Sequence, residues 1–295
     1  MPGSRVLAEI ERLDPARDFE RISFLSTNHD FPWDVEQSLD LAFFKTYATP
    51  SVSGLLDRTR EFRDRGQKRY DDTRLILAEF LDHGIDSERG RTAQRLMNRM
   101  HHRFEIANED YLYVLSAFIL EPMRWNARFG WRPYVENEKQ AHFHFWCAIG
   151  RRMPIRDLPP TLEAMERFNA AYERERFRYA DSNRRVADDT MRVFLSWYPP
   201  PLRPLAHLAV RALLDDAVLD AFAYPHPPRW FRACVFAALR LRAALVHFGP
   251  RRRTPHLNTE DRLRTYPNGY RTDELGVELP DAAFTTSGRG SADRP

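Results

Sequence analysis

Residues 93–104 read AQRLMNRMHHRF, and the spacing of their apolar side chains is that of an α-helix. In a helix that turns about 100° per residue, the apolar side chains of this stretch gather on one side. His101 lies at the edge of that side, whereas His102 falls among arginines on the polar side. The pattern therefore predicts a helix with one histidine facing the interior and its neighbour facing water. Taken alone, His101 is more often a hydrogen-bonded core histidine than a ligand.

The preceding segment, GQKRYDDTRLILAEFL at 66–81, belongs to a helix expected over residues 65–83. Residues three and four apart share a helix face, so Arg69 and Thr73 continue the apolar stripe of Ile76, Leu77 and Phe80. Arg69 is thereby directed towards the core, where an unpaired charge is costly. A carboxylate or a propionate would satisfy it. From these residues alone, an internal ion pair with an Asp or Glu is the favoured interpretation.

Helical spacing dominates the rest of the chain, and no run of short alternating segments indicates a sheet. We therefore predict an all-α fold in a single domain over residues 1–280, followed by a disordered tail at 281–295 that is rich in Gly, Ser and Thr. An irregular segment with several aromatic residues is expected at residues 24–33, before the helix at 34–47. The remaining helices are expected at 34–47, 51–60, 87–104, 108–128, 135–150, 160–179, 182–197, 203–222 and 228–247.

Local signals support these boundaries. Ser51, Ser87 and Asn108 are expected to cap helix N-termini. Gly84 and Gly130 are expected to end helices, and Pro122 should kink its helix or divide it. His142 and His144 are interpreted as packing or hydrogen-bonding residues, although one of them could enter a ligand pocket.

Composition narrows the function. The chain has 45 basic and 42 acidic residues and a net charge of +3, so no nucleic-acid partner is expected. Cys147 and Cys234 match no metal or disulfide spacing, and the charged N-terminus lacks a signal-peptide core, so a cytoplasmic location is expected. Arginines interrupt the apolar stretch 230–248, which predicts a buried or interfacial helix. The basic run 251–253 is interpreted as a solvated turn. The weaker alternative is that it attracts an anionic membrane surface and makes a peripheral membrane contact.

Five strings together resemble the family of the fungal mycophenolic-acid oxygenase MpaB, which is related to the bacterial rubber oxygenases. They are GQKRYDDTRLILAEFL, NRMHHRFEIANEDYLYVLSAFILEPMRW, GWRPYVENEKQAHFHFW, IGRRMPI and TYPNGY, and the similarity spans most of residues 18–278. The resemblance implies a globin-like helical core around haem b, with His101 of the Met-His motif as the ligand to the iron. It maps the Arg and Thr of the haem pocket onto Arg69 and Thr73, which we take as cofactor-binding and catalytic residues.

One position departs from the rubber oxygenases. Where they place a lysine immediately before the threonine, this chain has Asp72, and Lys68 lies about one helical turn before that position. A lysine on the distal side of the haem is therefore not assigned, and no catalytic base is named.

By resemblance, the chain is expected to be a haem b-dependent oxygenase that uses dioxygen, with cleavage of a carbon–carbon double bond in a prenyl-like or other apolar substrate as the expected reaction. Two alternatives stay open. One is a haem-binding or gas-sensing protein without turnover, and the other is a haem-free helical scaffold in which His101 is a core residue.

Overall fold

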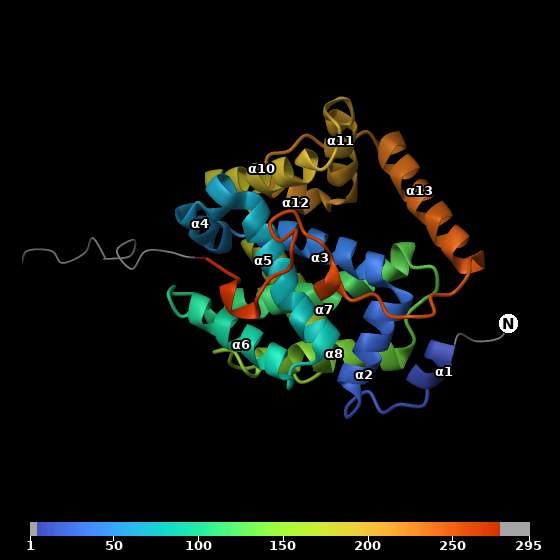
Figure 1. Ribbon diagram of the computed structural model, residues 1–295. Coiled ribbons are helices and arrows are strands. Elements are labelled where there is room, and N and C mark those ends of the chain that lie inside the picture. The colour runs from blue at the N-terminus through green and yellow to red at the C-terminus, as the bar shows by residue number, and fades with distance from the viewer. Residues whose placement is uncertain (1–4, 278–295) are drawn as a thin grey trace, which may run out of the picture.

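The computed structural model describes residues 5–277 and is all-α, with thirteen α-helices and no strand in that range (Figure 1). The predicted tail at 281–295 lies outside the described residues. The helices are α1 (Arg5–Ile10), α2 (Phe19–Phe24), α3 (Pro32–Tyr47), α4 (Pro50–Thr59), α5 (Glu61–His83), α6 (Glu88–His101), α7 (Asn108–Phe129), α8 (Glu136–Gly150), α9 (Leu162–Arg176), α10 (Asp181–Ser196), α11 (Arg203–Leu213), α12 (Asp216–Ala221) and α13 (Arg229–Phe248).

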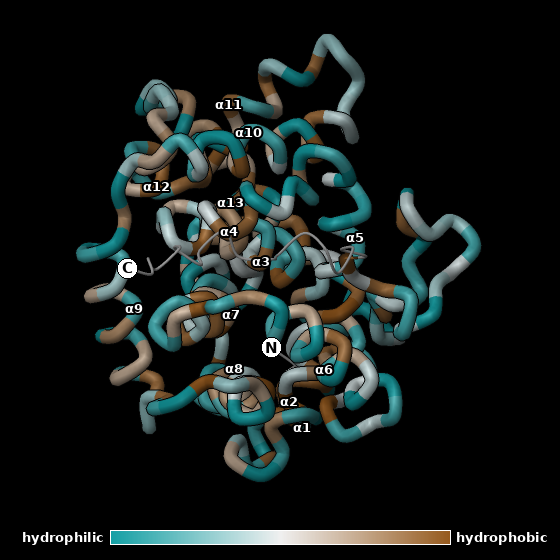
Figure 2. The backbone as a smooth tube through the Cα atoms, turned by 90° about the vertical axis from the view of Figure 1, so that its left-hand side faces the viewer, coloured by the Kyte–Doolittle hydropathy of each residue, from teal (hydrophilic) through white to brown (hydrophobic). Residues whose placement is uncertain are grey.

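The core is built from amphipathic helices whose apolar sides meet. Figure 2 shows hydrophobic and hydrophilic residues alternating along most of them, as the helical period requires. The largest group of buried apolar side chains joins α3, α5, α6, α7 and α8, and a second joins α3, α5, α10 and α12. Helix α5 takes part in both groups, so it connects the two halves of the interior.

Most predicted boundaries lie within a few residues of the observed ones. Ser87 caps α6, because its Oγ accepts a hydrogen bond of 2.8 Å from the backbone N–H of Gly90. Helix α5 ends before Gly84 and α7 ends before Gly130, as expected. Pro122, in contrast, does not divide α7, which continues through it.

Two capping predictions are wrong. Helix α4 begins at Pro50, after Thr49, so Ser51 lies within its first turn. The side chain of Asn108 does not cap α7 but bonds across to the backbone of Arg156, where its Oδ1 accepts from N–H at 2.8 Å. Helix α6 also stops earlier than predicted, which makes His101 its last residue.

Two larger predictions are corrected. The segment 24–33, expected to be irregular, is largely helical, because α2 continues into a π-helix over Leu25–Asp30. The expected helix at 203–222 is two helices, α11 and α12, because the chain turns extended at Leu214 and Asp215. This break directs the Asp215 carboxylate to the buried Lys45, 3.1 Å away.

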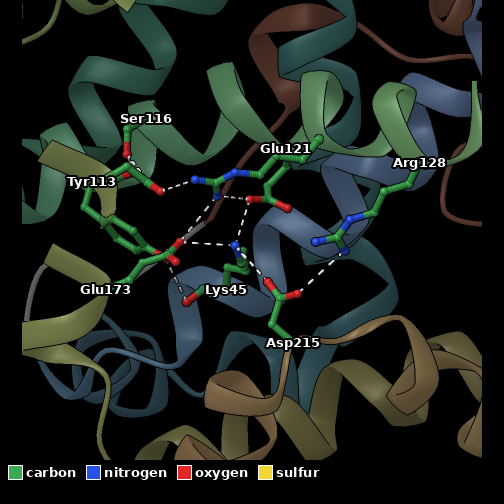
Figure 3. A network of polar contacts seen from close by, with 9 residues as sticks. Lys45, Tyr113, Ser116, Glu121, Arg128, Glu173 and Asp215 are labelled. Atoms are coloured by element: carbon green, nitrogen blue, oxygen red, sulfur yellow. Dashed lines mark hydrogen bonds and ion pairs between the residues drawn. The ribbon is translucent and has the colours of Figure 1, made fainter. Parts of the chain in front are cut away.

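Lys45 is the centre of a polar network that ties four parts of the fold together (Figure 3). Its Nζ lies 2.9 Å from Oε1 of Glu121 on α7 and 3.2 Å from Oε1 of Glu173 on α9, in addition to Asp215. Burial lowers the pKa of Lys45, but the carboxylates outweigh burial and hold that pKa above its ordinary value. The network thus keeps a charged lysine inside the protein.

Candidate functional site

A large cavity lies between α4, α5, α6 and α7. Its volume is about 530 Å³, within the roughly 300–1,000 Å³ typical of sites for small molecules and cofactors. The wall is largely apolar and aromatic, with contributions from Phe43, Leu55, Ile76, Met97, Phe118 and Trp146. Such a wall favours an apolar ligand through burial, and the few polar groups in it decide how the ligand is oriented.

His101 lies in this wall at the C-terminal end of α6. Its Nδ1 atom is buried and has no hydrogen-bond partner among the described residues, and its ring meets the edge of the Tyr111 ring at 5.5 Å. Burial, together with the charge of Arg69, lowers the pKa of His101 to about 4. The imidazole is therefore neutral near pH 7, the form in which a histidine nitrogen binds a metal. His102 is exposed, so the two adjacent histidines differ as their helical positions predict.

Arg69 and Thr73 lie in the same wall as His101, one turn apart on α5. Arg69 donates a short hydrogen bond to the Thr73 hydroxyl, and its guanidinium lies 5.3 Å from the centre of the Phe62 ring. Within residues 5–277 no carboxylate lies within ion-pair distance of Arg69. The internal ion pair favoured on sequence alone is thus wrong for the described residues, and the guanidinium can pair with an anionic group of a ligand.

Asp72 also lines the cavity, but both of its carboxylate oxygens already accept hydrogen bonds from other residues of the chain. Its Oδ2 accepts from Lys68 Nζ at 2.7 Å, and its Oδ1 accepts from the Tyr266 hydroxyl at 2.5 Å. Lys68 donates in addition to the Gly276 carbonyl at 3.1 Å. The lysine and the aspartate therefore neutralise each other beside the cavity, and both are bonded to the C-terminal end of the described chain.

A C-terminal strap, residues 258–277, runs across α5 and closes one side of the cavity with Gly276 and Val277 (Figure 1). Acids of α5 hold it in place. Asp82 Oδ2 accepts from the Thr259 N–H at 2.8 Å, and Glu79 Oε1 accepts from the Tyr270 hydroxyl at 2.7 Å. Gly276 has a φ of 101°, and a Cβ there would collide with Met100, so this position of the strap requires glycine.

Sequence reasoning missed the strap as part of the site. The string TYPNGY lies within it, but no periodicity indicated that it would fold back onto a helix nearly two hundred residues earlier. Tyr111 was missed as well, since it reads as one of several aromatic residues in α7. The two tyrosines of TYPNGY, Tyr266 and Tyr270, donate to the buried Asp72 and Glu79, and acids on an inward helix face, which need donors, were the available signal.

Three further polar side chains of the core, Arg124, Arg132 and His142, do not line the cavity. Arg124 pairs with Glu121 at 2.5 Å, and Arg132 pairs with Asp30 at 2.6 Å and Glu138 at 2.7 Å. His142 is buried, and its Nε2 lies 3.2 Å from the Phe118 carbonyl. These side chains stabilise the fold, and the interpretation of His142 as a hydrogen-bonding residue is confirmed.

Sequence comparison shows the family of the chain. Residues 43–246 match the model of the family described as "ER-bound oxygenase mpaB/B'/Rubber oxygenase, catalytic domain". The chain therefore belongs to this family of oxygenase catalytic domains. The match covers α4 to α12 in full, including Arg69, Thr73 and His101, and it ends before the strap.

Two similar proteins have names that match this family description. The ER-bound oxygenase mpaB' of Penicillium brevicompactum is 28% identical over 229 residues, which are 71% of this chain and 54% of that protein. The ER-bound oxygenase mpaB of Penicillium roqueforti is 27% identical over 213 residues, which are 66% of this chain and 72% of that protein. The chain thus spans about half the length of the first relative and nearly three quarters of the second.

Proposed function

We propose that this chain is a haem b-dependent oxygenase that binds its cofactor in the cavity through His101. The observation that carries the proposal is the His101 Nδ1 atom, which is buried without a hydrogen-bond partner in the described chain. A buried polar atom left in this way costs roughly 1–3 kcal/mol. A metal bound at Nδ1 itself would satisfy this atom and remove much of that cost.

The residues present fit a porphyrin better than a bare ion. Within residues 5–277 no group of three or more His, Cys, Asp or Glu side chains could hold a metal ion. An iron at His101 would therefore need most of its ligands from a macrocycle. The apolar walls suit the flat face of that group, and Arg69, without a carboxylate partner in the described chain, would pair with a propionate.

When bound, haem b supplies the iron chemistry that uses dioxygen. The residues of the chain do the rest. His101 contributes a neutral imidazole, Thr73 holds the guanidinium of Arg69 in place, and the aromatic walls exclude water. In this proposal the substrate is apolar and prenyl-like, and the reaction is oxidative cleavage of a carbon–carbon double bond. The wall supports the class of substrate, since it offers apolar contact and few directed polar contacts.

The experiment is to titrate the purified apoprotein with haem and follow the Soret band. Stoichiometric binding is expected, followed by oxygen consumption and formation of aldehyde or ketone products with an isoprenoid alkene. No Soret shift would indicate a haem-free scaffold, and haem binding without turnover on a panel of such alkenes would favour a haem-binding or gas-sensing protein. Arg69→Gln should weaken haem retention, and Arg95→Gln on the exposed side of α6 should not.

A further inference from the structure

Helix α13 presents an apolar side to solvent. Its residues at helical spacing include Trp230, Leu241, Leu245 and Phe248, which are 67%, 62%, 67% and 84% exposed. Alanines and Cys234 fill the positions between them on the same side. In Figure 1 the helix runs along the edge of the molecule. Since α13 has 20 residues, this exposed apolar side extends for roughly 30 Å at 1.5 Å per residue.

The inner side of α13 packs against α11 and α7. Arg242 on that side pairs with the buried Asp34 at 2.7 Å, and Arg232 pairs with Asp216 at 2.8 Å. The helix is thus fixed in its orientation by both packing and ion pairs. Nothing within residues 5–277 covers the outer side, although apolar patches of this kind on a soluble surface usually mark an interaction site.

The charge along α13 itself is of one sign. No Asp or Glu occurs between Asp220 and Glu260, whereas arginines stand at 229, 232, 240, 242 and 251–253. Arg229 and Arg240 flank the exposed apolar residues, and neither has a carboxylate within ion-pair distance in the described chain. An apolar stripe with tryptophan and phenylalanine, on a helix whose only ionised side chains are arginines, matches a helix that lies in the interface of an anionic bilayer.

We propose that the outer side of α13 docks on an anionic membrane surface. The helix would lie in the plane of the membrane, because no helix within residues 5–277 is long and apolar enough to cross one. A second copy of the chain is a poorer occupant, since two such faces would bring like-charged arginines together. The cavity is not needed for this contact, so the proposal stands apart from the haem proposal.

The chain offers a native probe for the test. Cys234 is exposed on the outer side of α13, whereas Cys147 is buried, so a thiol-reactive, polarity-sensitive fluorophore will label Cys234 selectively. Vesicles of phosphatidylcholine with phosphatidylserine should shift its emission to the blue, and raising the salt should weaken the effect. The same label on Arg95→Cys in a Cys234→Ser background should not respond. Vesicles of phosphatidylcholine alone should bind more weakly.

Unlabelled variants provide the second measurement, by co-sedimentation with the same vesicles. Arg240→Glu and Leu241→Glu should each lower the partition coefficient by about tenfold or more, and Arg95→Glu, with the same change of charge on α6, should leave it unchanged. Equal binding by all variants, or no binding to either kind of vesicle, would overturn the proposal. An emission shift without vesicles that rises with protein concentration and accompanies a dimer mass would also overturn it, in favour of a second copy.

Discussion

The Nε2 atom of His142 on α8 lies 3.2 Å from the carbonyl oxygen of Phe118 on α7. That carbonyl is the one that residue 122 would bond in a regular helix, and Pro122 has no N–H to offer. Burial lowers the pKa of His142 to about 4, so the ring is neutral near pH 7 and donates through Nε2. An imidazole from the neighbouring helix thus replaces the bond that the proline removes, beside the wall of the cavity.

His142→Phe should therefore destabilise the protein by about 1–3 kcal/mol, because it leaves the Phe118 carbonyl buried and unsatisfied. Urea unfolding followed by circular dichroism measures this change. His144→Phe is the matched control, because His144 lies two positions further along α8 and makes no such bond in the described chain, so its effect should be much smaller. Equal losses in the two variants would contradict the assigned role of His142.

Lys45→Met should cost about 3–5 kcal/mol, because it leaves the carboxylates of Glu121, Glu173 and Asp215 together without their shared cation. Adding Glu121→Gln should recover part of the loss, since it removes one of the buried charges. The control is the exposed pair of Arg176 and Glu109, where Arg176→Met should cost less than about 1 kcal/mol. A Lys45→Met protein as stable as the Arg176→Met protein would refute the account of the network.

Asp40 should make stability fall as the pH rises. Its Oδ1 accepts from the Tyr70 hydroxyl at 2.9 Å, and burial, aided by the nearby Glu36, raises the pKa of Asp40 from 3.8 to about 8. Between these two values the folded protein keeps a proton that the unfolded chain has released. Stability contributed by that proton is complete below pH 3.8 and is lost as the pH rises towards 8, with a slope of at most about 1.36 kcal/mol per pH unit.

Asp40→Asn removes this titration and should flatten the dependence of the free energy of unfolding on pH. Chemical denaturation at pH 5, 6, 7 and 8 measures it. Glu175→Gln, at an exposed position of α9, should leave the wild-type slope intact. If wild type and Asp40→Asn show the same slope, the carboxyl of Asp40 is ionised throughout this range and the assignment fails.

Local periodicity was enough to predict the helical part of the fold and the inner wall of the site. Arg69 and Thr73 face the cavity because they continue an apolar stripe, and His101 faces it because it borders one. These placements depend on residues within one or two turns of each other. The division between α11 and α12 could not be seen in the same way, since it depends on Asp215 meeting Lys45 from a distant helix.

The strap, too, could not be predicted from local periodicity. Tyr266 binds Asp72 and lies 194 positions from it along the chain, and no pattern of neighbouring residues encodes such a pairing. The π-helix over Leu25–Asp30 was missed because its sequence, LSTNHD, is rich in residues typical of turns and caps. Tertiary contacts on both sides of it override that local preference.

The central claim is that His101 is the protein ligand of a haem in this cavity, and the most direct measurement compares the haem content of His101→Ala with that of His102→Ala. Both variants are purified from haem-replete cells, checked for folding by circular dichroism and assayed as the pyridine haemochrome. The account predicts that His101→Ala folds but loses at least about nine tenths of its haem, since even the loss of an outer-shell partner of a metal ligand lowers affinity by about 10–100-fold. His102→Ala should keep its haem. A folded His101→Ala protein with full haem, beside a His102→Ala protein without it, would contradict the claim.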